Sequence, residues 1–146
     1  MVTPGSRMTR EGERIENGAE ERWEQITATG ARLLLTRGTP RPGGQEKVAA
    51  CLAREKTALE CGANAAQISA ENPLDSVDLP AGATHMDLTD AICPEEIRSE
   101  AGVCPAIVGN VAVWYDNSHL SGTYVETMVP YFEERLQDTV PWLFED

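Results

Sequence analysis

Two residues that could act as a general base and its carboxylate partner lie three positions apart near the C-terminal end. Asp116 and His119 follow residues 111–115, whose β-branched and aromatic side chains predict a strand. A turn after that strand can bring the two side chains together. The carboxylate then fixes the imidazole tautomer and leaves the other ring nitrogen free to accept a proton. The alternative is an ordinary turn, in which Asp116 caps backbone N–H groups and His119 has no chemical role.

The four cysteines form two local pairs, Cys51 with Cys61 and Cys93 with Cys104. No Cys-x-x-Cys occurs, which disfavours a zinc ribbon. We expect local disulfides, although four cysteines allow three connectivities and four buried thiols are a further alternative. Disulfides would place the chain in an oxidising compartment outside the cytosol.

The N-terminal residues 1–18 are polar and lack the apolar centre of a signal peptide. No apolar run approaches the ~20 residues of a membrane-spanning helix. An exported chain without an export signal is explained if the sequence is part of a longer protein, with a signal or membrane anchor upstream. The net charge of -12 argues against nucleic acid as a partner, because duplex binding needs a cationic face.

Helices are expected at residues 19–29, 45–54, 63–71 and 123–136, and strands at residues 33–35, 85–88 and 111–115. Strands that alternate with helices predict an α/β fold with a short parallel sheet covered on both faces. Three strands are few for that architecture, so the sheet is expected to be incomplete. Thr123 and Glu126 fit a capping box at the start of the last helix.

Residues 31–136 resemble the SGNH domain fused to bacterial membrane acyltransferases of the acyltransferase-three class. The most specific stretch is residues 104–124, with its Cys-Pro pair, Gly-Asn strand and Asp-x-x-His-Leu block. Residues 33–42 are similar to the family's strand and Asp-Thr-Pro-Arg loop. Residues 87–94 match its segment before the first Cys-Pro.

The resemblance implies an incomplete flavodoxin-like three-layer fold, with a partial SGNH domain at residues 19–138 and a C-terminal tail at 139–146. It implies an extracytoplasmic location, attached to a membrane acyltransferase domain in the parent protein. The implied activity is transfer or hydrolysis of an acyl group, typically acetyl, between an acyl donor and a cell-envelope glycan. His119 would be the general base and Asp116 its orienting partner, and no cofactor or metal is implied.

The sequence departs from the family at the nucleophile, because no Gly-Asp-Ser block occurs. The nearest match, Gly5-Ser6, has no expected buried strand before it. Gly38 replaces the Asp of the family's loop, while Arg41 remains as a possible substrate contact or an ordinary surface residue. His85, with Asp87 beside it, is interpreted as a structural histidine.

We therefore expect this chain alone to be inactive in acyl transfer. Two alternatives remain open from the sequence. One is a secreted carbohydrate esterase of the same superfamily, of which this chain is again a part. The other is a non-catalytic binding module that is held together by disulfides and has lost its nucleophile.

Overall fold

The computed structural model describes residues 1–9, 11–43, 46–68 and 70–144, and it divides into two compact units. We call the first the sheet unit; it comprises Met1–Gly38, Glu71–Leu88 and Phe132–Asp146. We call the second the stapled unit; it comprises Thr39–Ala70 and Thr89–Tyr131.

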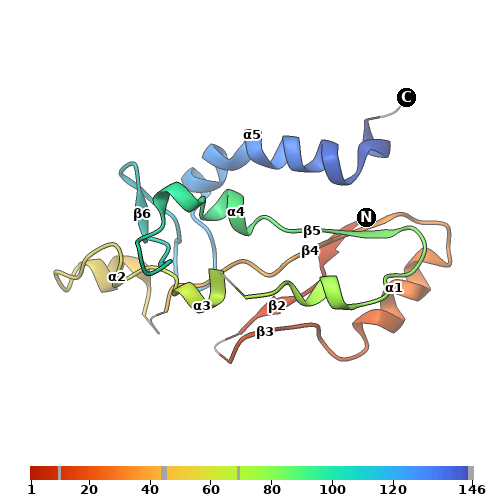
Figure 1. Ribbon diagram of the computed structural model, residues 1–146, viewed down its shortest axis with the longest axis horizontal. Helices are drawn as coiled ribbons and strands as arrows, with labels where there is room; N and C mark the ends of the chain where they lie inside the picture. Colours follow the sequence, from red (N-terminus) through yellow and green to blue (C-terminus); the bar gives the residue numbers. More distant parts are fainter. Residues whose placement is uncertain (10, 44–45, 69, 145–146) are drawn as a thin grey trace. The chain divides into compact units, whose positions relative to one another are not determined.

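A three-stranded parallel sheet organises the sheet unit (Figure 1). Its strands are β1 (Val2–Pro4), β4 (Leu33–Thr36) and β5 (Ala83–Met86), in the order β1-β4-β5. Both β1 and β5 pair in parallel with β4, which is the central strand. The protein is thus a mixed α/β structure with a short parallel sheet, as the sequence predicts.

Side chains of β4 are buried on both faces of this sheet. Leu33 and Leu35 pack with Trp23 of helix α1 (Ala19–Thr27) and with Leu74. In a strand, alternate side chains point to opposite faces. Leu34 accordingly lies in a second cluster, with Met86 and Val140. The uninterrupted run of leucines is therefore explained by burial of both faces of the sheet. Burying each leucine side chain stabilises the fold by roughly 1.5–3 kcal/mol.

Short elements complete the sheet unit. Strands β2 (Arg7–Met8) and β3 (Glu13–Arg14) form an antiparallel pair directly after β1. Two 3-10 turns, η1 (Pro73–Ser76) and η3 (Pro141–Leu143), lie in the other two segments of the unit.

Short helices and isolated backbone pairs make up the stapled unit. The helices are α2 (Val48–Leu52), α3 (Ala65–Ile68) and α4 (Thr89–Ile92), followed by the 3-10 turn η2 (Glu95–Ile97). Strands β6 (Ile107–Val108) and β7 (Val111–Ala112) form an antiparallel hairpin.

Both disulfides favoured by the sequence are present, Cys51–Cys61 and Cys93–Cys104, each with a Cα–Cα distance of 5.8 Å. Ala63, two residues after Cys61, links the segments next to the two disulfides, because it forms isolated bridges with both Pro42 and Cys104. The neighbouring Gly62 packs against the backbone of Cys104, and a Cβ atom at position 62 would lie 1.9 Å from the Cys104 carbonyl oxygen. A side chain at position 62 is therefore incompatible with this packing.

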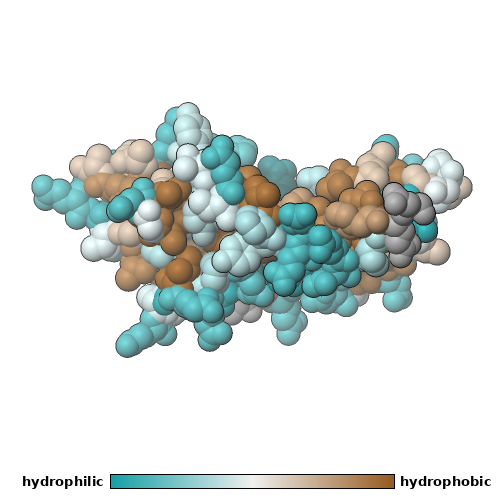
Figure 2. Space-filling model, turned by 90° about the horizontal axis from the view of Figure 1, so that it is seen from above, coloured by the Kyte–Doolittle hydropathy of each residue, from teal (hydrophilic) through white to brown (hydrophobic). Residues whose placement is uncertain are grey.

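Helix α5 (Gly122–Thr139) is longer than predicted, contains Pro130, and runs from the stapled unit into the sheet unit. Its N-cap is Ser121, whose Oγ accepts a hydrogen bond from the Tyr124 N–H at 3.1 Å, so the capping box predicted at Thr123 is wrong. Apolar side chains remain exposed on it, Val125, Val129 and Tyr131 among them. The face of the molecule in Figure 2 likewise shows hydrophobic side chains interspersed with hydrophilic ones.

The third strand of the parallel sheet was predicted at the wrong place. Residues 111–115 contain only the two-residue strand β7, which pairs with β6 rather than joining the parallel sheet. The reason is the Gly109-Asn110 turn, where both residues have positive φ (54° and 67°), as a tight two-residue hairpin requires. The strand that does join is β1, within residues for which no element was predicted.

Other elements are displaced by a few residues from their predicted positions. Helix α2 begins at Val48 rather than at Gln45, which lies outside the described residues. Helix α3 is only one turn long, and β5 (Ala83–Met86) begins and ends two residues before the strand predicted at residues 85–88. Among the described residues, no helix is long and apolar enough to span a membrane.

Candidate functional site

The Asp116–His119 pair lies in a tight loop of the stapled unit. The two sides of this loop pair through backbone hydrogen bonds: Tyr115 N–H donates to the His119 carbonyl and Ser121 N–H donates to the Val113 carbonyl, both at 2.9 Å. Ser121 Oγ also donates to the Ala112 carbonyl. The loop geometry is therefore fixed by the backbone on either side of the pair.

Asp116 organises this loop through both carboxylate oxygens. Its Oδ1 accepts hydrogen bonds from the backbone N–H groups of Ser118 and His119, both at 2.8 Å. Its Oδ2 lies 2.9 Å from His119 Nδ1. The predicted proximity of the two side chains is therefore confirmed, and the predicted backbone capping by Asp116 is present as well.

The protonation states follow from these contacts. The hydrogen bond with the His119 side chain, and then those from the backbone N–H groups of His119 and Ser118, hold the pKa of Asp116 well below its usual range. An ionised carboxylate can only accept hydrogen bonds, so Nδ1 of His119 must carry the proton. Nε2 is then the basic nitrogen of the neutral ring. The His119 side chain is 75% exposed, so this nitrogen can be reached from solvent.

Ser118 is the serine nearest to the pair, but it lies on the wrong side of the ring to be activated. Its Oγ is 3.1 Å from His119 Nδ1 and 3.1 Å from Asp116 Oδ1. A nucleophile activated by this histidine must instead contact Nε2. Ser118 therefore supports the turn rather than completing a triad.

The loop that carries Arg41 is anchored to the same unit. The buried indole N–H of Trp114 donates to the Pro40 carbonyl at 2.9 Å, and the Arg41 N–H donates to the Gln67 side chain at 2.7 Å. Arg41 itself is partly exposed. Its predicted role as a substrate contact stays a prediction.

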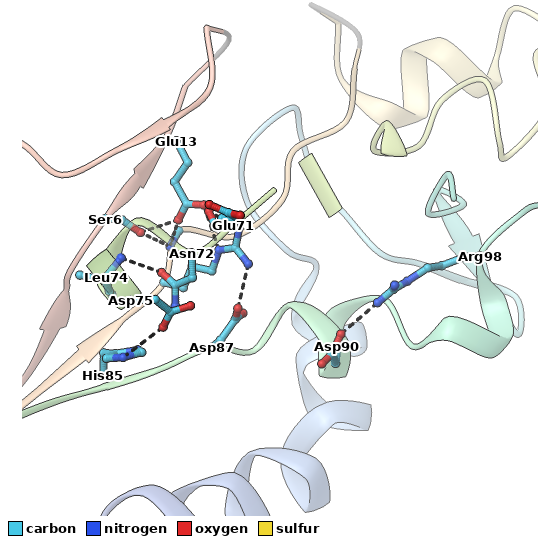
Figure 3. A network of polar contacts seen from close by, with 12 residues as sticks. Ser6, Glu13, Glu71, Asn72, Leu74, Asp75, His85, Asp87, Asp90 and Arg98 are labelled. Carbon is cyan, nitrogen blue, oxygen red and sulfur yellow. Dashed lines mark hydrogen bonds and ion pairs between the residues drawn. The ribbon is translucent and has the colours of Figure 1, made fainter. Parts of the chain in front are cut away.

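A second polar cluster, which sequence reasoning missed, lies at the carboxyl ends of the parallel strands in the sheet unit (Figure 3). Arg37 follows β4 and forms ion pairs with Glu13 at 2.9 Å and with Asp87, which follows β5, at 2.8 Å. The Arg37 and Glu13 side chains are 5% and 3% exposed. Burial alone would lower the pKa of Arg37, but its hydrogen bonds to Asp87 and Glu13 outweigh burial and raise it.

Ser6 belongs to this cluster and lies two residues after β1. Two of the three residues of β1 are exposed, which agrees with the prediction that no buried strand precedes Gly5-Ser6. Its buried Oγ donates to Glu13 Oε1 at 2.5 Å and accepts from the Gly38 N–H at 2.9 Å. Gly38 leaves no room for the family's Asp, since a Cβ there would lie 2.7 Å from the Met8 backbone nitrogen. The sequence did contain a signal for this cluster: Arg37 and Asp87 each come directly after a strand of the parallel sheet. Open α/β sheets bind their ligands at this edge.

His85 pairs with Asp75 at 3.4 Å rather than with Asp87, which binds Arg37. Within the described part of the chain, no group of three or more His, Cys, Asp or Glu residues is arranged to hold a metal ion. Comparisons with protein-family models, curated proteins and solved structures found no match to this chain.

Proposed function

We propose that this chain is the Asp–His portion of an SGNH-type domain that transfers or hydrolyses an acyl group, typically acetyl, on a cell-envelope glycan. The observation that carries the proposal is the 2.9 Å contact between Asp116 Oδ2 and His119 Nδ1, which leaves Nε2 basic and exposed. The short parallel sheet is compatible with the flavodoxin-like three-layer fold that this proposal requires.

In the proposed reaction, His119 Nε2 accepts the proton of a serine hydroxyl as that oxygen attacks an ester carbonyl. Asp116 stabilises the imidazolium that results and keeps the ring oriented. The ester bond to the alcohol then breaks, and the protonated ring returns the proton to the departing alcohol, which leaves the acyl group on the serine. Water or a glycan hydroxyl, deprotonated by the same Nε2, then takes the acyl group and releases the serine. The serine would come from a Gly-Asp-Ser segment outside these 146 residues, since Ser118 faces Nδ1 and Ser6 is buried.

The location that we propose is extracytoplasmic, attached to a membrane acyltransferase domain of the parent protein. Two disulfides fit an extracellular location, because such bonds persist in oxidising compartments. The proposed partners are the acyl donor and the glycan acceptor.

A non-catalytic binding module is the second candidate. It is favoured by the position of Ser118, which contacts Nδ1 and leaves the basic Nε2 without a nucleophile from its own loop. A module of this kind would bind the glycan without changing it.

The deciding experiment compares this chain with a version extended by the in-frame codons upstream of Met1. Hydrolysis of 4-nitrophenyl acetate and acetyl release from an O-acetylated glycan are measured for both. We expect serine-dependent activity only in the extended protein, and a loss of at least about 100-fold in kcat/KM for His119→Ala. Asp116→Asn should cost less if the carboxylate only orients the ring.

His85→Ala is the matched control, because His85 is the only other histidine of the chain. This substitution should change kcat/KM of the extended protein by no more than about twofold, since a residue that does not contact the reacting groups contributes little to transition-state stabilisation. Equal activity of the wild type and His119→Ala would show that the Asp116 turn is structural. Glycan binding without any hydrolysis would favour the binding module.

A further inference from the structure

An exposed tyrosine lies opposite His119 in the loop that carries the Asp116–His119 pair. Trp114 bridges to Leu120 in antiparallel register, and the next pair inward is Tyr115 with His119, joined by the 2.9 Å backbone hydrogen bond. Side chains of directly opposed residues in an antiparallel pair point to the same face. Tyr115 and His119 therefore share one face of the loop, and the buried Trp114 takes the other.

This shared face is open to solvent. Tyr115 is 68% exposed and the His119 side chain is 75% exposed. Lys47 places its ammonium group 5.7 Å from the centroid of the Tyr115 ring. The face thus combines an aromatic ring, a cation and a basic nitrogen.

The cation is notable in a chain with a net charge of -12, in which Lys47 and Lys56 are the only lysines. A chain this acidic repels anions in general. An ammonium group held over an exposed ring is a local exception, since the negative face of the ring orients the cation. A ligand that suits this face has C–H groups for the ring and a negative charge for the ammonium group.

We propose that Tyr115 and Lys47 form a subsite for an anionic sugar residue of the acceptor, a proposal that rests on the proposed function. The C–H face of the sugar ring carries partial positive charge and packs on the negative π face of Tyr115. A carboxylate substituent pairs with Lys47. A hydroxyl of the bound sugar is then held on the same face of the loop as His119 Nε2. Tyr115 and Lys47 thus position the acceptor.

The test is an NMR titration of the 146-residue chain with tetragalacturonate, an acidic oligosaccharide, and with neutral maltotetraose. We expect tetragalacturonate to shift the backbone amide signals of Tyr115, His119 and Lys47. Tyr115→Ala should weaken its affinity by about tenfold, the size of one aromatic stacking contact. Tyr115→Phe keeps the ring and should bind like the wild type.

Lys47→Gln should weaken tetragalacturonate binding several-fold and leave the weaker binding of maltotetraose unchanged. Lys56→Gln and Tyr131→Ala are the matched controls, because both residues are exposed and belong to the same unit. Neither should change either affinity. Unshifted signals at all three positions at millimolar oligosaccharide, or equal binding by Tyr115→Ala and the wild type, would overturn the proposal.

This result is separable from the proposed function, because binding requires no serine nucleophile. Catalysis that depends on His119, together with unchanged binding and kcat/KM for Tyr115→Ala, would overturn the subsite alone. Binding that depends on Tyr115, in an extended protein without hydrolysis, would support the subsite and overturn the proposed reaction.

Discussion

The sheet unit and the stapled unit are held together by different interactions. In the sheet unit, a parallel sheet with leucines buried on both faces of β4 is joined to a buried ion-pair cluster around Arg37. In the stapled unit, two disulfides and single backbone bridges connect short helices and a small hairpin. The candidate histidine lies in the second kind of structure.

This difference indicates how the candidate site is kept rigid. The Asp116 loop belongs to no extended sheet, yet it is fixed by the backbone pairs of Tyr115 with His119 and of Val113 with Ser121. Short irregular segments bury little apolar surface, so covalent links supply the constraint that a larger core would otherwise provide. The comparison predicts that the two units respond differently to the same perturbation.

Reduction of both disulfides should have the largest effect, and it should be confined to the stapled unit. Each disulfide closes a loop of about ten residues, which corresponds to about 3 kcal/mol in the chain-entropy estimate. Hydrogen exchange measured with and without a reductant should show lost protection in Thr89–Tyr131 and retained protection in β4. Equal loss in both units would contradict the division.

Arg37→Met should destabilise the sheet unit by about 3–5 kcal/mol, because it leaves the buried carboxylate of Glu13 without its cation. Chemical denaturation followed by tryptophan fluorescence would measure this change. Adding Glu13→Gln to Arg37→Met should recover part of the loss. Arg22→Met, at an exposed position of α1, is the control and should change stability by less than about 0.5 kcal/mol. Equal effects of the two arginine substitutions would show that the cluster is not structural.

Gly62→Ala should destabilise the stapled unit by about 1–3 kcal/mol, since the new methyl group would overlap the Cys104 carbonyl oxygen. Gly43→Ala is a control in the same unit, because a Cβ there meets its nearest atom at 3.8 Å. Thermal melts of both variants would compare them. A loss of stability for Gly43→Ala as large as for Gly62→Ala would argue against the tight approach.

Asp116→Asn should have the smallest effect, and the effect should depend on pH. The pKa of Asp116 is lowered in the folded state, so its carboxylate adds stability above its unfolded pKa of about 3.9. That contribution is lost as the pH falls through the lower folded value. The wild type should therefore lose its advantage over Asp116→Asn between pH 5 and about pH 2. Parallel stability curves over that range would show that the turn does not lower the pKa of Asp116.

Local sequence patterns predicted part of this structure. The leucine run and the Asp-x-x-His turn were found because each is encoded within a few neighbouring residues. Strand β1 was missed because two of its three residues are exposed and it ends in Pro4, so no apolar pattern marks it. The Arg37 cluster was missed because its partners Glu13 and Asp87 are 24 and 50 residues away in sequence. Only the pairing of β1 and β5 with β4 brings the strand ends together.

The double use of the Asp116 carboxylate has a consequence for reading related sequences. One oxygen fixes two backbone N–H groups, and the other fixes the imidazole. A related chain without the proposed activity would still need this aspartate to close its loop, whereas the His119 side chain is 75% exposed and could be replaced without loss of packing. In related sequences, an aspartate at position 116 would therefore indicate that the loop is kept. A histidine at position 119 would be the better indicator of the proposed activity.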